Sequence, residues 1–242
     1  DALFLFVGDN KGGVKTVSKL VKEQISWCRK ESSAKHCSLF VGLFNGIRKE
    51  FDIEQWYTHT QISINNTEFT LSSLPGVFSH ERLDKGTQVL LNHLPNLLKG
   101  KVLDFGCGAG PIAIYALKNN KDIEVEMIDV NALALASSKK SLEQNDLKGK
   151  VYPSDSLHQV TNTYDVVLSN PPFHQGIKTN YAATEYFLNF VSKHLTPTGD
   201  LHVIANSFLR YKPIMESQFK HYEQLANQQG FTHHFCTGKK IN

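Results

Sequence analysis

The sequence predicts an α/β protein with a doubly wound, mostly parallel sheet, preceded by part of a second α/β domain. Three observations lead to this prediction. From Lys101 onward, short apolar stretches alternate with segments that repeat apolar residues at helical spacing. A glycine-rich stretch, residues 106–110, separates the first apolar stretch from a helix that would begin at Pro111. A stiff Asn-Pro-Pro-Phe turn, residues 170–173, follows a later apolar stretch.

The alternation after Lys101 predicts parallel strands joined by crossover helices. We expect strands at 101–105, 123–129, 150–152, 164–169, 199–206 and 231–236. We expect helices at 111–119, 132–145, 180–194 and 213–229. Because ligands of such sheets bind outside the carboxyl ends of the strands, the residues that follow the strands form the candidate site.

The first 100 residues have a different organisation. The expected elements are a strand at 2–7, a helix at 14–25, a strand at 38–47, a hairpin at 60–71 and a helix at 83–98. Asn65-Asn66 supplies the turn of the hairpin. Pro75-Gly76 interrupts the pattern, so we place a domain boundary near residues 72–76, with domains at 1–74 and 75–242.

The composition is that of an ordinary globular protein: of 242 residues, 40% are hydrophobic and 20% are charged. No apolar run approaches the roughly 20 residues that a membrane helix needs. The four cysteines show no Cys-x-x-Cys spacing, so neither a zinc site nor a disulfide framework is expected. We therefore expect a cytoplasmic, monomeric protein without a metal and without a membrane partner.

Charge is unevenly distributed along the chain. Residues 1–50 contain nine Lys or Arg against five Asp or Glu, although the whole chain carries a net charge of only +3. Lys15, Lys19 and Lys22 lie on the polar side of the helix expected at 14–25. Such a basic segment is typical of a contact with nucleic acid, and it is equally typical of a solvated helix face.

The glycine-rich stretch has the spacing Gly-x-Gly-x-Gly, formed by Gly106, Gly108 and Gly110. The dinucleotide fingerprint Gly-x-Gly-x-x-Gly would need a glycine at 111, where this chain has proline, so a nicotinamide cofactor is disfavoured. A carboxylate at the end of the next strand, Asp129, is placed to accept hydrogen bonds from a ribose.

Further along, Asp155 is placed to accept a hydrogen bond from an adenine amino group. Capping of a turn or helix explains Asp155 equally well. The first, second and fourth strands of this region end in Asp104, Asp129 and Asn170. Polar residues at three neighbouring strand ends indicate a site for chemistry.

The Asn-Pro-Pro-Phe turn is the more selective of the two motifs. Its two prolines remove two N–H donors, so the acceptors that remain are the side-chain oxygen of Asn170 and the carbonyl of Pro171. A rigid pair of acceptors suits a flat group with an exocyclic amino group, on which Phe173 could stack. The turn therefore predicts a site that binds a planar group with an exocyclic amine.

These motifs resemble those of class I S-adenosylmethionine-dependent methyltransferases that methylate amino groups. The residues that carry the resemblance are 102–110, Asp129 and Asn170-Pro171-Pro172-Phe173-His174. Segments 75–79, 83–87 and 205–209 more closely resemble the ribosomal RNA small-subunit methyltransferase C family. The resemblance is specific over 75–242 and looser over 1–74, which resembles the end of that family's N-terminal, methyltransferase-like domain.

The resemblance implies a seven-stranded Rossmann-like sheet, S-adenosylmethionine as cofactor and the N2 amino group of a guanine in 16S ribosomal RNA as the target. It implies that the partner is this RNA within the small ribosomal subunit. Cofactor contacts are implied for Phe78, Thr87, Asp104, Gly106, Cys107, Gly108, Gly110, Asp129, Asn131, Asp155 and Asn170. The guanine would be held by Asn170, Pro171 and Phe173, with His174 beside it, and Lys15, Lys19 and Lys22 would contact RNA.

Two alternatives remain open at the level of sequence. The same tetrapeptide suits methylation of adenine N6 in DNA or RNA, or of a glutamine amide in a protein. A non-catalytic RNA-binding or ribosome-assembly module is the alternative of another class, which the intact tetrapeptide disfavours.

Overall fold

The computed structural model describes residues 2–21, 25–44, 50–95, 97–172 and 178–240, with the side chains of 178–182 left aside. Its contacts divide the chain into two compact units, Asp1–Asp52 and Ile53–Asn242. The structure divides the chain between Asp52 and Ile53, whereas the predicted boundary lies near residues 72–76, after the hairpin at 58–73. Within the described residues, no helix is long and apolar enough to span a membrane.

The first unit is a three-stranded antiparallel sheet with one short helix. Its elements are β1 (Ala2–Asp9), α1 (Val14–Leu20), β2 (Ile25–Ala34) and β3 (Cys37–Phe44), and the strand order is β1-β3-β2. The helix is shorter than predicted, because Ile25 begins β2 instead of completing an apolar helix face. Strand β2 was not predicted; it is mostly exposed, so it lacks the apolar alternation on which strand prediction depends.

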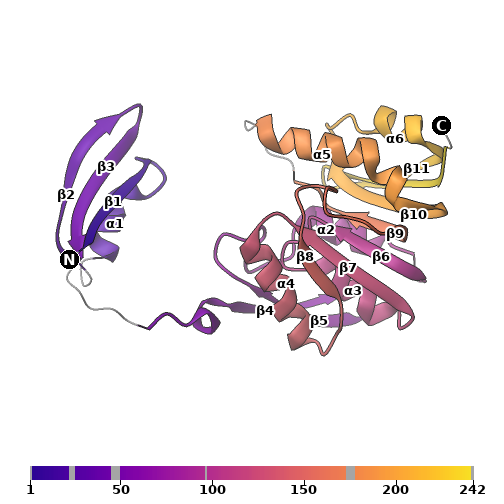
Figure 1. Ribbon diagram of the computed structural model, residues 1–242, viewed down its shortest axis with the longest axis horizontal. Helices are drawn as coiled ribbons and strands as arrows, with labels where there is room; N and C mark the ends of the chain where they lie inside the picture. The colour runs from indigo at the N-terminus through magenta and orange to yellow at the C-terminus, as the bar shows by residue number, and fades with distance from the viewer. Residues whose placement is uncertain (1, 22–24, 45–49, 96, 173–177, 241–242) are drawn as a thin grey trace. The chain divides into compact units, whose positions relative to one another are not determined.

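The second unit contains the predicted doubly wound sheet, with helices on both faces (Figure 1). The strands are β6 (Gly100–Phe105), β7 (Ile123–Asp129), β8 (Lys150–Pro153), β9 (Tyr164–Ser169), β10 (Leu195–Asn206), β11 (Phe219–Gln228) and β12 (Phe231–Lys239). Their order is β11-β12-β10-β9-β6-β7-β8, and the pairs from β10 to β8 are parallel. Strand order reverses between β6 and β9, where such sheets bind ligands.

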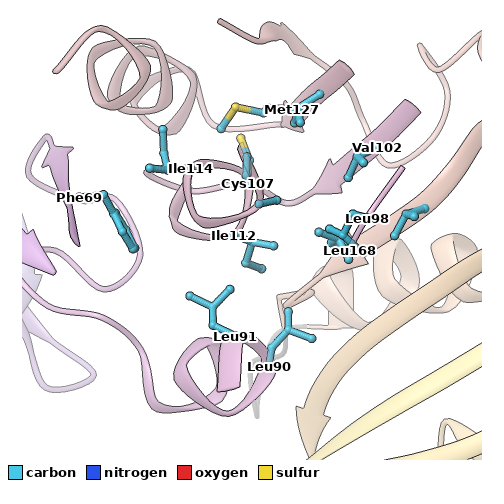
Figure 2. Close-up of a cluster of buried hydrophobic side chains, with 14 of the residues drawn as sticks. Phe69, Leu90, Leu91, Leu98, Val102, Cys107, Ile112, Ile114, Met127 and Leu168 are labelled. Carbon is cyan, nitrogen blue, oxygen red and sulfur yellow. The ribbon is translucent and has the colours of Figure 1, made fainter. Parts of the chain in front are cut away.

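Helices cover the two faces of this sheet and form two cores. They are α2 (Lys85–Asn92), α3 (Pro111–Asn119), α4 (Ala132–Gln144), α5 (Lys178–Phe190) with η2 (Val191–His194), and α6 (Lys212–Gln218). One core joins α2, α3 and α4 to one face, and the other joins α5, η2 and α6 to the opposite face. Figure 2 shows Phe69 of the preceding hairpin among the side chains of the first core, with Ile112 and Ile114 of α3.

That hairpin, β4 (Thr58–Ile64) and β5 (Thr67–Ser73), follows the short helix η1 (Ile53–Trp56) and turns at Asn65 and Asn66, as predicted. It belongs to the second unit because α4 binds the free edge of β5. The backbone N–H groups of Leu74, Ser72 and Thr70 donate to side chains of α4 and its C-cap. The three acceptors, each four residues after the last, are Ser137, Ser141 and Asn145, at 3.1, 2.9 and 3.0 Å.

The helix predicted at 213–229 is wrong in its second half. Helix α6 ends at Gln218, and the following residues form β11, which pairs antiparallel with β12. Gln229 and Gly230 form the turn of this hairpin, both with positive φ, 55° and 81°. Strand pairing overrides the helical spacing of the apolar residues here.

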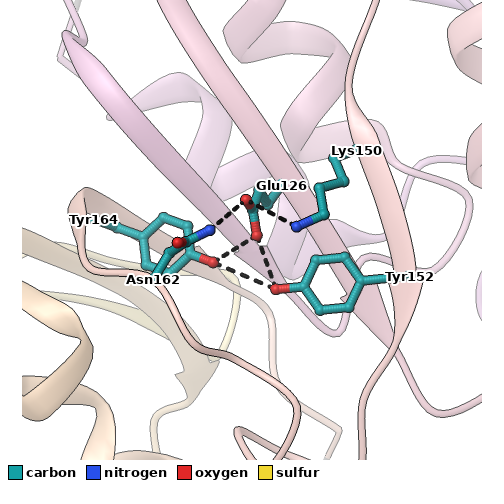
Figure 3. Close-up of polar contacts among 5 residues, drawn as sticks. All are labelled: Glu126, Lys150, Tyr152, Asn162 and Tyr164. Carbon is teal, nitrogen blue, oxygen red and sulfur yellow. Dashed lines mark hydrogen bonds and ion pairs between the residues drawn. The ribbon is translucent and has the colours of Figure 1, made fainter.

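A half-buried carboxylate, that of Glu126, joins β7, β8 and β9 on the face opposite the first core (Figure 3). Glu126 accepts hydrogen bonds from the hydroxyls of Tyr164 and Tyr152, at 2.7 and 2.8 Å, and from the Asn162 amide at 2.7 Å. Lys150 lies 3.4 Å from the same carboxylate. Burial raises the pKa of Glu126, but the hydrogen bonds from Tyr164 and Tyr152 and the charge of Lys150 together outweigh it, so the pKa is below its ordinary value.

We predict that Glu126→Gln lowers the free energy of unfolding at neutral pH by about 1–2 kcal/mol, because an amide presents a donor to neighbours that donate. Because the folded-state pKa is depressed, the contribution of Glu126 is present above 4.5 and is lost as the pH falls through the folded value. Denaturant unfolding across this range should therefore show a flatter pH profile for the variant. The exposed Glu124→Gln on the same strand is the control, and equal profiles for both variants would contradict the prediction.

Candidate active site

A cavity of about 390 Å³ lies at the carboxyl ends of β6, β7, β8 and β9, beside the reversal of strand order. Four loops that follow these strands line it, together with the segment that leads into α2. The two motifs that the sequence singled out therefore meet at one cavity: Gly106, Cys107 and Gly108 line it, and so do Asn170 and Pro171.

Backbone hydrogen bonds to β7 fix the glycine loop. The N–H groups of Gly106 and Cys107 both donate to the carbonyl of Ile128, at 2.9 and 3.0 Å. Gly106 and Gly108 have φ values of 70° and 55°, a conformation that side chains disfavour. A Cβ at Gly108 would meet nothing within 4 Å, so this part of the cavity wall is bare backbone.

Asp129 connects the glycine loop to the start of α4. One carboxylate oxygen accepts from the N–H of Gly108 at 3.0 Å, and the other accepts from the N–H of Asn131 at 2.8 Å. Each oxygen keeps a further lone pair, so the carboxylate can still accept from two hydroxyls of a ligand. Asn131 caps α4 through Leu133 N–H at 2.9 Å, and the exposed Asp155 lines the cavity beyond it.

Asp104 lies behind the loop and does not line the cavity. It is fully buried; one oxygen accepts from the N–H of Ala113 at 3.1 Å, and the other has no partner among the described residues. Burial raises the pKa of Asp104 to about 7, against the lowering effect of the Ala113 N–H. Burial and the neighbouring Asp104 also raise the pKa of the Cys107 thiol, which is therefore not a thiolate nucleophile.

Gly110, predicted to contact the cofactor, does not line the cavity. It is the N-cap of α3, with φ at 87°, and a Cβ there would lie 2.6 Å from the Cε atom of Met127. The structure therefore needs glycine at this position for helix entry and close packing. Phe78 and Thr87, for which the resemblance also implied cofactor contacts, both line the cavity, Phe78 with 58% of its surface exposed.

The Asn-Pro-Pro turn is fixed from two neighbouring elements. The Ser169 hydroxyl donates to the carbonyl of Phe105 at 2.9 Å, which ties the end of β9 to the end of β6. The Thr184 hydroxyl of α5 donates to the carbonyl of Pro172 at 2.8 Å. The turn therefore presents Asn170 and Pro171 to the cavity in a defined orientation.

The remaining predicted site residues are one aromatic residue, one histidine and three lysines. Phe173, His174 and Lys22 lie outside the described residues. Lys15 and Lys19 are exposed on α1 of the first unit. Within the described residues, no group of three or more His, Cys, Asp or Glu side chains could hold a metal ion.

The cavity also contains residues that the sequence reasoning missed, above all Asp84 and Arg82. Asp84 caps α2, since its carboxylate accepts from Thr87 N–H at 3.0 Å. An aspartate just before a helical pattern is a standard N-cap signal, and it would have moved the predicted helix start from Leu83 to Lys85. Nothing in the spacing of residues indicated that this cap reaches the site.

Comparison with known families gives a consistent result. The model of the methyltransferase small domain matches residues 68–233, and that of its N-terminal domain matches residues 1–60. The chain belongs to the methyltransferase small domain family. Ribosomal RNA small subunit methyltransferase C of Colwellia psychrerythraea is 46% identical over 230 residues, which are 94% of this chain and 64% of that protein.

The same-named protein of Pseudoalteromonas translucida is 42% identical over 231 residues, which are 96% of this chain and 68% of that protein. The chain thus spans about two thirds of the length of the curated relatives it matches. Among solved structures, the 16S rRNA N2 G1207 methyltransferase of T. thermophilus, in complex with AdoMet and guanosine, has a TM-score of 0.85 at 23% identity. That match covers 98% of this chain and 65% of that one, and it confirms the predicted fold.

The cavity residues fit S-adenosylmethionine, the cofactor that the sequence resemblance implies. The bare backbone at Gly108 leaves room for a ligand against the loop, and the Asp129 carboxylate is oriented to accept from a ribose. One oxygen of Asp104 has no partner among the residues that the structure describes, and this oxygen would stabilise a positive group near the loop.

We predict that Gly108→Ala weakens binding of S-adenosylmethionine at least about 10-fold, because the added methyl group projects into the cavity. Gly230→Ala is a matched control, since Gly230 also has a positive φ, 81°, and open space around its Cβ position. Both variants should lose a similar stability of roughly 1 kcal/mol from backbone strain. Equal cofactor affinities of the two variants by calorimetry would contradict a ligand at Gly108.

Proposed function

We propose that the full protein transfers a methyl group from S-adenosylmethionine to the exocyclic N2 amino group of a guanine in 16S ribosomal RNA, in the cytoplasm. The observation that carries this proposal is the meeting of Asn170 and Pro171 with the glycine loop and Asp129 at one cavity. The names of the curated relatives support ribosomal RNA as the substrate class. The T. thermophilus protein, described as acting on N2 of G1207, supports this guanine nitrogen as the target.

The chemistry assigns distinct work to each part of the site. The cofactor, when bound, supplies a methyl group on a positively charged sulfur. The glycine loop and Asp129 would hold the nucleoside and methionine parts of the cofactor in the cavity that the Asn-Pro-Pro turn also lines. Asn170 Oδ1 and the Pro171 carbonyl accept the two N–H bonds of the amine. Their acceptor geometry draws the nitrogen lone pair out of conjugation and directs it at the methyl carbon.

No strong base is needed in this mechanism. The nitrogen becomes positively charged as it is methylated, and its proton is then acidic enough to leave to water or to an acceptor of the site. A guanine within RNA must first leave its stack, which costs a few kcal/mol. Phe173, which lies outside the described residues, and the exposed Phe78 at the rim are the aromatic residues proposed to offset this cost.

We also propose that the first unit helps to bind the RNA substrate. Its basic residues include Lys15 and Lys19, which are both exposed on α1. Methylation of adenine N6 or of a glutamine amide uses the same acceptor geometry. The names of the relatives favour ribosomal RNA over these substrates.

The decisive test of the substrate maps methylated bases in 16S ribosomal RNA from cells with and without this protein. We predict loss of one N2-methylguanine in the cells without it, and restoration by the wild-type gene. Restoration should fail with Asn170→Ala, whose transfer rate we expect to fall roughly 100-fold while cofactor affinity stays unchanged. Asn189→Ala, an exposed position on α5, is the control. An unchanged methylation pattern in the deleted cells would refute the proposed substrate.

For RNA binding, Lys15→Gln combined with Lys19→Gln should weaken affinity uniformly across RNA sequences. The slope of log affinity against log salt should become shallower by about 0.7–0.9 for each phosphate contact removed. The control pair Lys118→Gln and Lys121→Gln removes the same charge from exposed positions at the amino ends of the strands of the second unit. If both pairs leave the same slope as wild type, the lysines of α1 form a solvated helix face.

A further inference from the structure

The amide of Asn170 makes two contacts that the proposed mechanism has not used. Its Nδ2 atom donates to Asp84 Oδ2 and to Thr87 Oγ1, each at 2.9 Å. Asp84 and Thr87 lie at the start of α2, more than 80 residues earlier in the chain, and all three residues line the cavity. Both N–H bonds of the amide are therefore taken by α2, and the remaining polar atom of the side chain is the acceptor Oδ1.

Asp84 determines which way round the amide lies. An amide side chain has nearly the same shape when its oxygen and nitrogen are exchanged by a half turn, but its hydrogen bonding reverses. An ionised carboxylate can only accept, so it binds the NH₂ group and repels the carbonyl oxygen. The hydroxyl of Thr87 can donate or accept, so it strengthens the contact without choosing the orientation.

The carboxylate itself is held in place. Asp84 Oδ2 accepts from the N–H of Thr87 at 3.0 Å, so one oxygen binds both the first turn of α2 and the amide of Asn170. Thr87 is 3% exposed, and its neighbour Gly86 packs so closely on Phe231 that a Cβ would lie 2.9 Å from its ring. The contact between Asp84 and Asn170 is partly buried, and in such a setting a hydrogen bond to a carboxylate is stronger than in water and polarises the amide toward its oxygen.

From this geometry we infer that Asp84 and Thr87 are positioning residues that determine the substrate class of the site. By turning the Asn170 carbonyl outward, they select a planar group that donates, an exocyclic amine, over one that presents an acceptor. This inference rests on the proposed function and extends it to residues of α2. Neither residue needs to touch the substrate, because they act through the orientation of Asn170.

The test separates capping of α2 from orientation of the amide. Asp84→Ser keeps an N-cap of similar strength, but its hydroxyl is one bond too short to reach Asn170. Asp84→Asn offers an oxygen at the length of the native carboxylate, so it can serve both contacts. We expect D84S to lower kcat for methyl transfer to 16S ribosomal RNA roughly 100-fold, with unchanged S-adenosylmethionine affinity and thermal stability. D84N should recover most of this loss.

A second pair tests the same contact from the other side. Thr87→Val removes the hydroxyl while keeping the shape, and Thr87→Ser keeps the hydroxyl; we expect a loss in kcat of roughly 10-fold for T87V and little for T87S. Gln88→Ala, exposed on the next position of α2, should leave transfer unchanged. If wild type is active and D84S and T87V equal it in kcat, the inference is overturned while the function stands. If wild type transfers no methyl group to RNA, both are overturned.

Discussion

Both amide protons of Asn170 are bound by the first turn of α2, and the direction of one side-chain carbonyl follows from that constraint. The two prolines after Asn170 have no N–H to offer, so the corner at the end of β9 presents acceptors. This corner lines the same cavity as the glycine loop, which is bare backbone at Gly108, and as Asp129, whose carboxylate is oriented by two backbone N–H groups. A donor-rich amine and a ribose-bearing cofactor are complementary to these two halves.

The sheet brings the glycine loop and the Asn-Pro-Pro turn together, although the two motifs are far apart in the sequence. The end of β6 carries the glycine loop, and the end of β9 carries the acceptor corner; the two strands are parallel neighbours at the reversal of strand order. Ser169 bridges their ends at 2.9 Å. The hairpin β4–β5, bound along its edge by α4, leads directly into the segment that places Phe78, Arg82 and Asp84 at the cavity. The hairpin thus belongs to the second unit through its contacts with α4.

Sequence reasoning predicted the central part of this arrangement because local chemistry determines it. The strand ends at Phe105, Asp129 and Ser169 match the prediction, and residues Gly106–Gly108, Asp129 and Asn170 meet as expected. Patterns of this kind depend on turn residues and short apolar strands, which a single sequence displays directly.

The parts that were missed depend on long-range contacts. Residues 219–228 have helical spacing, yet pairing with β12 makes them a strand. The backbone N–H groups along the edge of β5 donate to the side chains of Ser137, Ser141 and Asn145. In the sequence, these three residues look like ordinary polar positions of a helix. Asp84 was readable as a helix cap, but its contact with Asn170 crosses 86 positions of sequence. Hydrophobic periodicity carries no information about a single long-range hydrogen bond, so this contact is seen only in the folded structure.

The central claim, that the site accepts hydrogen bonds from an exocyclic amine, can be measured with two nucleosides. Guanosine and inosine differ by that amino group alone, and calorimetry can compare their binding to the full chain saturated with S-adenosylhomocysteine. We expect guanosine to bind at least about 10-fold more tightly, since inosine leaves the acceptors at Asn170 and Pro171 without donors. Equal affinities for the two nucleosides would contradict it.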